Sequence, residues 1–160
     1  MSTIRPTYAA AAVIACTLTG LANGASRQSA MQDNSVNLFL DALVSLTLKT
    51  AAGTLSTTPY VDVFAYALGD AAGAGPNYTD GATGADAGFT MPANTNLKQI
   101  GRVNVNSAAS NTYSPPMSVA QAFGGNLPLR WGLVVTNSSG LALDAAVSGA
   151  SFIGVQMQNI

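Results

Sequence analysis

The sequence predicts an all-β fold, a jelly-roll-like antiparallel β-sandwich with an extended N-terminal arm. Three observations support this prediction. Short segments alternate between apolar and polar residues with a period of two, Gly, Pro, Asn and Ser cluster between those segments, and no long amphipathic helix pattern is present. A chain of 160 residues is long enough for one compact core. We therefore expect residues 1–11 to form the arm and residues 12–160 to form a single sandwich domain.

The first two predicted strands are residues 12–19 and 25–32. They flank the segment Ala22-Asn23-Gly24, whose residue types favour a tight turn. We expect the two strands to pair with each other across this turn.

The clearest alternation covers residues 36–49, where every second residue is apolar. This pattern is typical of a strand with one buried face, and it predicts that Leu40 and Leu46 both lie in the core. Phe39 and Leu43 interrupt the polar face, and fourteen residues is long for one strand, so we expect a bulge or bend within it.

Five later strands are predicted at residues 60–68, 97–105, 129–136, 141–146 and 151–158. Residues 137–140 have the composition of a hairpin loop that would join the strands on either side of them. Trp131 shares the alternation of its strand, which places it in the core. In the last strand, the alternation predicts that Ile153, Val155 and Met157 face inward.

Two segments do not have strand character. Residues 69–88 form a long Gly-, Ala- and Asp-rich loop, and a loop of this length in a compact domain usually has a function or is disordered. Pro115-Pro116 favours the opening of a short helical turn over residues 117–123, which Gly124 would close.

The composition is unusual for its low charge. Charged residues make up 8% of the chain and the net charge is −1, whereas hydrophobic residues make up 48%. Because like charge normally keeps subunits apart, a weakly charged surface favours assembly. The six basic residues are scattered, so we expect no nucleic-acid partner, since phosphate binding needs clustered cations. The longest apolar run, residues 9–15, is too short to span a bilayer, and we expect no membrane partner.

The residue types argue against an enzyme. The chain has no histidine, no glutamate and one cysteine, Cys16, which excludes Ser-His-Asp and Cys-His catalysis. Paired aspartates could in principle act as acid and base, and the candidate pairs are Asp62 with Asp70 and Asp80 with Asp86. Asp62 lies between valines on a strand, which favours exposure to solvent or pairing with an arginine. We expect no catalytic activity and a buried, unreactive Cys16.

Residues 77–86 are the best candidate for a metal site. Asn77, Asp80 and Asp86 provide oxygen donors at short spacing, and calcium prefers six to eight such ligands. The spacing does not fit an EF-hand, and short polar side chains of this kind commonly cap turns. We therefore expect turn capping, with calcium as a weak alternative, and no cofactor.

The N-terminus has some features of a targeting segment. Arg5 precedes a short apolar stretch that ends at Cys16, and residues 13–16 have the residue types of a lipoprotein cleavage box. Pro6 interrupts the start of this segment, and residues 17–19 continue with strand-like alternation. We therefore favour an arm that leads into the first strand and reaches a neighbouring subunit.

Four segments resemble the small virion structural proteins of tailed bacteriophages. The resemblance covers roughly residues 20–145, and its segments are residues 21–30 followed by Asp33-Asn34, residues 40–44, residues 77–87 and residues 126–137, the last with the sequence Asn-Leu-Pro-Leu-Arg-Trp-Gly-Leu-Val-Val-Thr-Asn. It implies a non-enzymatic component of the virion. Within that group, a capsid decoration or cement protein is favoured, a jelly-roll-like homotrimer on the capsid surface whose partners are its own copies and the major capsid protein.

Two alternatives remain open. The first is a tail, collar, baseplate or fibre-associated subunit, which differs from a decoration protein in copy number per particle. The second belongs to another class, a secreted carbohydrate-binding β-sandwich module or lipoprotein, which predicts a mature chain that begins at or after Cys16.

Overall fold

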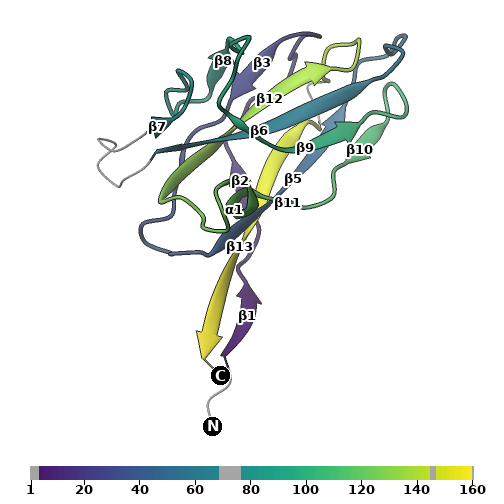
Figure 1. Ribbon diagram of the computed structural model, residues 1–160. Coiled ribbons are helices and arrows are strands. Elements are labelled where there is room, and N and C mark those ends of the chain that lie inside the picture. The colour runs from purple at the N-terminus through teal and green to yellow at the C-terminus, as the bar shows by residue number, and fades with distance from the viewer. Residues whose placement is uncertain (1–3, 69–76, 145–146, 160) are drawn as a thin grey trace.

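The computed structural model describes residues 4–68, 77–144 and 147–159. Two antiparallel sheets pack face to face, and a narrow two-stranded ribbon projects from one end of the sandwich and carries both chain ends (Figure 1). The predicted all-β sandwich is therefore confirmed. No helix among the residues that the structure describes has the length and apolar character needed to cross a membrane.

The first sheet, here sheet A, has the order β1-β13-β5-β10, with β2 paired to β13 and β11 paired to β5. Its strands are β1 (Ile4–Tyr8), β2 (Ala12–Ile14), β5 (Asp41–Lys49), β10 (Asn111–Tyr113), β11 (Met117–Ser118) and β13 (Gly149–Asn159). Helix α1 (Val119–Ala122) follows β11 directly, and the Ser118 hydroxyl caps it by accepting a hydrogen bond from the Gln121 N–H.

The second sheet, here sheet B, has the order β7-β6-β12-β3-β8, with β9 paired to β6 and β4 paired to β12. Its strands are β3 (Ser26–Gln28), β4 (Gln32–Asp33), β6 (Tyr60–Leu68), β7 (Asn77–Tyr78), β8 (Ala87–Phe89), β9 (Lys98–Asn104) and β12 (Arg130–Ser138). The chain crosses between the sheets repeatedly, so most hydrogen-bonded neighbours are distant in sequence.

The core lies between the sheets and is made by alternate residues of the long strands. Sheet A contributes Ala42, Val44, Leu46 and Leu48 from β5, and sheet B contributes Val61, Val63, Ala65, Trp131, Leu133 and Val135 from β6 and β12. Trp131 is 1% exposed and meets the Phe152 ring edge-on at 5.2 Å. The predicted core position of Trp131 is confirmed, and Cys16 is buried as expected.

The outer face of sheet B is covered by the chain itself. Tyr66 and Val134 are fully buried on this face, together with Leu97. Ala82, Phe89 and Met91, from the segments around β8, pack over them. The long segment after β6 therefore closes one side of the sandwich, although its residues 69–76 lie outside the described residues.

The strands predicted at 60–68, 97–105 and 129–136 are confirmed within two residues at each end. The strands predicted at 12–19 and 25–32 are too long, because β2 ends at Ile14 and two short strands, β3 and β4, occupy the second segment. These two segments also do not pair with each other: β2 joins β13 in sheet A, whereas β3 and β4 join β12 in sheet B.

The hairpin predicted at 137–140 is wrong. The partners of β12 are β3, β4 and β6, and among the described residues the segment that follows it contributes an isolated bridge between Leu143 and Thr50. Residues 145–146 of the predicted strand 141–146 lie outside the described residues. The Asn137 side chain holds the chain in this different course, because its amide donates to the carbonyls of Leu21 and Leu141 and so ties the end of β12 to the N-terminal segment.

The strand predicted at 36–49 begins five residues late, at Asp41. Asn34 causes the delay: its side-chain amide donates to the Phe39 carbonyl and its side-chain oxygen accepts from the Phe39 N–H at 2.8 Å. These bonds close residues 34–39 into a turn. As a result Leu40 is 48% exposed, which corrects the prediction that it lies in the core, whereas Leu46 is buried as expected.

Candidate interaction surfaces

The ribbon is formed by β1 and the last five residues of β13. Ile4 lies opposite Asn159 and Tyr8 lies opposite Val155. Beyond Val155, β13 has no further pairing with β5, so within the described chain this part of the ribbon is only two strands wide (Figure 1). A two-stranded ribbon alone is at best marginally stable in water.

The two faces of the ribbon differ sharply in polarity. Residues directly opposite each other in an antiparallel pair point to the same face, so the register assigns each side chain to one face. One face carries the apolar side chains Ile4, Pro6, Tyr8, Val155 and Met157, with the polar Asn159 opposite Ile4 at the tip. The other face carries the polar side chains Arg5, Thr7, Gln156 and Gln158.

Three apolar side chains of β13, Ile153, Val155 and Met157, face away from the core, which corrects the prediction that they point inward. Ile153 is 36% exposed and Met157 is 58% exposed. The inward positions belong to Ala150, Phe152 and Gly154. Phe152 packs on Trp131, and the Phe39 ring occupies the space beside Gly154.

The apolar face of the ribbon continues onto the outer face of sheet A. Ile153 lies opposite Leu43 of β5, and Val13 of β2 lies opposite Ser151. Three residues, 9–11, lie between the pairs Tyr8–Val155 and Ala12–Phe152, where β13 has only two. This bulge of one extra residue changes the alternation, so that Tyr8 and Val13 both point outward.

We call this continuous surface the outer apolar face. It consists of Ile4, Pro6, Tyr8, Val13, Leu43, Ile153, Val155 and Met157. Asp41 lies opposite Val155 on the same side of sheet A and so brings one carboxylate to this face. That carboxylate accepts hydrogen bonds from the Ser118 hydroxyl and the Ala120 N–H. No other part of the described chain packs over this face, in contrast to the covered outer face of sheet B.

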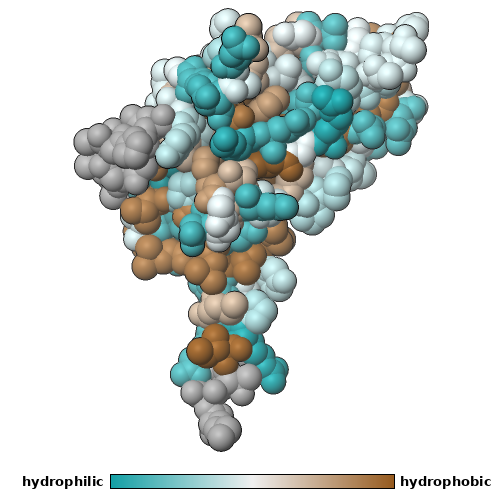
Figure 2. Space-filling model, in the orientation of Figure 1, coloured by the Kyte–Doolittle hydropathy of each residue, from teal (hydrophilic) through white to brown (hydrophobic). Residues whose placement is uncertain are grey.

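A second apolar surface is the loop of residues 36–40, between β4 and β5. Val36 is 86% exposed and Leu38 is 63% exposed. Figure 2 shows brown, apolar residues gathered at this end of the body, close to where the ribbon leaves it. Leu38 has a backbone φ of 50°, which is strained for a branched side chain, and the Asn34 hydrogen bonds hold it there. The loop therefore presents its apolar side chains in a fixed conformation.

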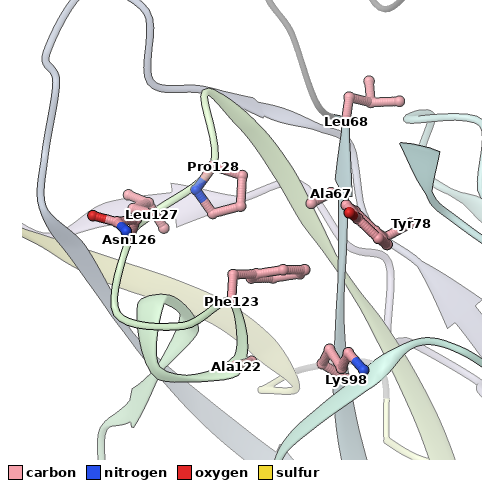
Figure 3. Close-up of a pocket in the computed structure, with 9 residues that line it drawn as sticks. All are labelled: Ala67, Leu68, Tyr78, Lys98, Ala122, Phe123, Asn126, Leu127 and Pro128. Atoms are coloured by element: carbon pink, nitrogen blue, oxygen red, sulfur yellow. The ribbon is translucent and has the colours of Figure 1, made fainter. Parts of the chain in front are cut away.

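An apolar pocket of about 360 Å³ is lined in part by Leu127, whose backbone N–H donates to the carbonyl of Leu40 at the end of this loop. Phe123 points into it towards Tyr78 and Ala67, and Leu127 and Pro128 form another wall (Figure 3). Lys98 and Asn126 are the charged and amide side chains that line it. A sugar site needs several converging hydrogen-bonding groups, so this pocket is better suited to an apolar side chain than to a carbohydrate.

The predicted calcium candidates Asn77, Asp80 and Asp86 belong to separate local structures. Asn77 pairs with Leu68 through β7. Asp80 accepts hydrogen bonds from the Thr95 hydroxyl and the Asn96 N–H, and these bonds hold its pKa below the ordinary value. Among the residues that the structure describes, no three acidic, cysteine or histidine side chains gather into a group that could hold a metal.

Asp86 connects the N-terminal segment to sheet B. It accepts hydrogen bonds from the Thr17 N–H at 3.0 Å and the Arg27 Nε at 2.6 Å. Partial burial raises the pKa of this carboxyl, but the Arg27 and Thr17 hydrogen bonds outweigh that effect and lower it overall. Both aspartates therefore stabilise turns and segment contacts.

Asp62 forms an ion pair with Arg102. Pairing with an arginine was one of two expectations from the sequence for this residue, the other being exposure to solvent. The Arg102 Nε lies 2.6 Å from the Asp62 carboxylate, and the guanidinium stacks 3.7 Å above the centre of the Tyr60 ring. The Gln99 amide donates to the same carboxylate. Asp70, the predicted partner of Asp62 in an acid–base pair, lies outside the described residues.

Comparison with known proteins finds no matching family model, no matching curated protein and no matching solved structure. The geometry of the chain itself must therefore support any functional proposal.

Sequence reasoning missed both apolar surfaces, and each left a signal. Asp33-Asn34-Ser35 is a run of turn-forming residues that could have indicated an interruption before Asp41. The alanine run at 9–12 has no side chains large enough to fix a strand alternation, and it is where the bulge occurs.

Proposed function

We propose that this chain is a non-enzymatic structural subunit of a bacteriophage virion. In this role it acts as a capsid decoration or cement protein that binds the major capsid protein and its own copies. The observation that carries the proposal is the display of apolar side chains outside the core, on the loop of residues 36–40, which Asn34 holds in place, and on the outer apolar face.

The energetics of the loop of residues 36–40 support a role in binding. Val36 and Leu38 are mostly exposed to water, and burying apolar surface is favourable by roughly 25 cal/mol per Å². Holding Leu38 at positive φ costs on the order of 1–3 kcal/mol in the isolated chain. When another surface covers the loop, the free energy gained by burying Val36 and Leu38 offsets the cost of the strained backbone at Leu38.

The polar side chains support a structural role rather than catalysis. Asp62, Asp80 and Asp86 each accept hydrogen bonds from side chains or backbone groups of their own domain. Burial raises the pKa of Cys16 to about 12, which keeps its thiol protonated and unreactive at neutral pH.

Quantitative gel densitometry of purified particles tests the proposal. A decoration protein is present in hundreds of copies per particle, in proportion to the major capsid protein. A few to a few dozen copies would contradict the cement role and support the tail, collar or baseplate alternative. Absence of the chain from particles would overturn the proposal of a virion subunit.

A further inference from the structure

We propose that the outer apolar face binds a second copy of this chain. The inference rests on the proposed function, because it identifies the surface and the partner through which this structural subunit associates with itself. Four features of the described residues support it: the unequal covering of the two sheets, the polarity of the ribbon, the low charge of the face, and its size.

The two sheets are covered unequally. Large apolar side chains on the outer face of sheet B, such as Tyr66 and Val134, are buried beneath the segments around β8. On sheet A, Val13 is 82% exposed, and Ile153 and Met157 also remain in contact with solvent. The chain thus supplies its own cover for one side and none, within the described residues, for the other.

The ribbon has the polarity pattern of a strand pair packed on one face. If both faces remained in water, nothing would favour separating Pro6 and Met157 from Arg5 and Gln158. Alternation with a period of two is favoured where one face is buried. Pro6 also lacks a backbone N–H, which weakens hydrogen bonding along β1 and favours contact through the face over addition of another strand.

The low charge of the face favours a second copy as the partner. Arg5, the charged residue of the ribbon, lies on the polar face. The carboxylate of Asp41, which lies opposite Val155 on the outer apolar face, already accepts hydrogen bonds from Ser118 and Ala120. A face with so little charge can meet an identical copy with little like-charge repulsion, whereas a different partner is usually selected by complementary charge. The ribbon is also a narrow extended strip, and a second copy provides a strip of the same length and polarity. Symmetric self-association is the commonest mode of assembly for such a surface.

The area of the face is sufficient for a stable contact. Ile4, Tyr8, Val13, Ile153 and Met157 are between 36% and 82% exposed. At about 200 Å² for a large side chain, these five alone present roughly 600 Å². Exposed apolar patches larger than about 600 Å² are rare on monomers. A standard interface buries about 800 Å² per partner, and Pro6, Leu43 and Val155 add further area.

The test compares two neighbouring residues on opposite faces of the ribbon. Met157→Lys places a cation on the outer apolar face, and Gln158→Lys places the same cation on the polar face; both positions are exposed. Molar mass is measured by light scattering over a concentration series. We expect the wild type and Gln158→Lys to have the molar mass of two or more chains, and Met157→Lys to have the molar mass of one chain, 16.1 kDa. Val13→Lys, placed in the body of sheet A, should give the same loss.

Two results would overturn the inference. One is a wild type that remains a single chain throughout the series, and the other is equal behaviour of Met157→Lys and Gln158→Lys. Thermal melting of each variant serves as the control for whether its sandwich remains folded. Incorporation into particles separates the two proposals: a wild type that is monomeric in solution but abundant in particles would leave the virion role intact and assign the face to a different neighbour.

Discussion

The Phe39 ring lies against the backbone of Gly154, with its ring atoms 2.5 Å from the position that a Cβ at residue 154 would take. This contact joins the two apolar surfaces, because Phe39 belongs to the turn held by Asn34 and Gly154 lies where the ribbon leaves the body. The conformation of the loop of residues 36–40 is therefore coupled to the base of the ribbon.

Gly154→Ala is expected to destabilise the fold. The added methyl group would collide with the Phe39 ring, and overpacking of this kind costs about 1–3 kcal/mol. Gly149→Ala is the matched control on the same strand, because a Cβ at residue 149 would contact nothing within 4 Å. Urea unfolding should show a lower midpoint for Gly154→Ala alone. Equal midpoints would mean that Phe39 is free to move aside.

Leu46→Asp and Leu40→Asp should have opposite outcomes, although the period-two pattern treats the two leucines alike. Leu46 is 1% exposed, and an unpaired carboxylate there would cost enough to unfold a marginally stable domain. Leu40 is half exposed, so Leu40→Asp should fold with a loss of about 1 kcal/mol. Circular dichroism and Trp131 fluorescence distinguish the two outcomes. An unfolded Leu40→Asp variant would contradict the turn at residues 34–39.

Leu38→Gly should leave stability unchanged or increase it. Glycine adopts a φ of 50° without steric cost, and relief of roughly 1–2 kcal/mol of strain offsets the greater entropy of glycine in the unfolded chain. Leu40→Gly, which relieves no such strain, should lower the melting temperature. If both variants melt equally early, Leu38 is not strained in solution.

Stability should be constant between about pH 5 and 8 and fall in acid. The chain has no histidine or glutamate to titrate in that range. Hydrogen bonds from Ser35, Thr95 and Arg27, respectively, help to lower the pKa values of Asp33, Asp80 and Asp86 below their ordinary value. A lowered folded-state pKa gives stability above the unfolded-state value of about 3.9, and this stability is lost as the pH falls through the folded-state pKa. Thermal melts from pH 3 to 8 measure it, and Asp86→Asn should reduce the acid slope.

Stability should also fall in alkali, for the opposite reason. Burial raises the pKa of Cys16 from 9.0 to about 12 and that of Tyr66 from 10.0 to about 12. A raised folded-state pKa gives stability that is complete below the unfolded-state value, and it is lost as the pH rises from about 9 towards 12. Urea midpoints measured from pH 8 to 11 should decline, and Cys16→Ala should decline less steeply. A constant midpoint would mean that both groups ionise equally in the folded and unfolded chains.

The sequence was sufficient to predict the sandwich and most of its long strands, because β6, β9 and β12 alternate clearly between turn-forming residues. It could not predict which face of β13 lies inward. In the body of the sandwich, β13 offers small or apolar residues on both sides, with Phe152 and Gly154 on one side and Ile153 and Val155 on the other. The choice between the two sides depends on Trp131 and Phe39, which come from distant parts of the chain. The period-two pattern therefore located the strand but assigned its faces wrongly.

The N-terminal arm shows a similar limit. Residues 4–8 were expected to extend from the domain towards a neighbour, and the structure pairs them with the end of their own chain in β13. Pairing between the two ends of a chain depends on the fold that brings them together, and the local sequence does not encode it.

The location of both chain ends has a practical consequence for experiments. Ile4 and Asn159, the first and last described residues, lie opposite each other, so a peptide or fluorescent protein fused next to either of them would be attached at the tip of the ribbon (Figure 1). There it could block access to the ribbon sterically. The exposed turn at residues 107–110, on the body of the sandwich, offers an insertion point that leaves the tip unencumbered.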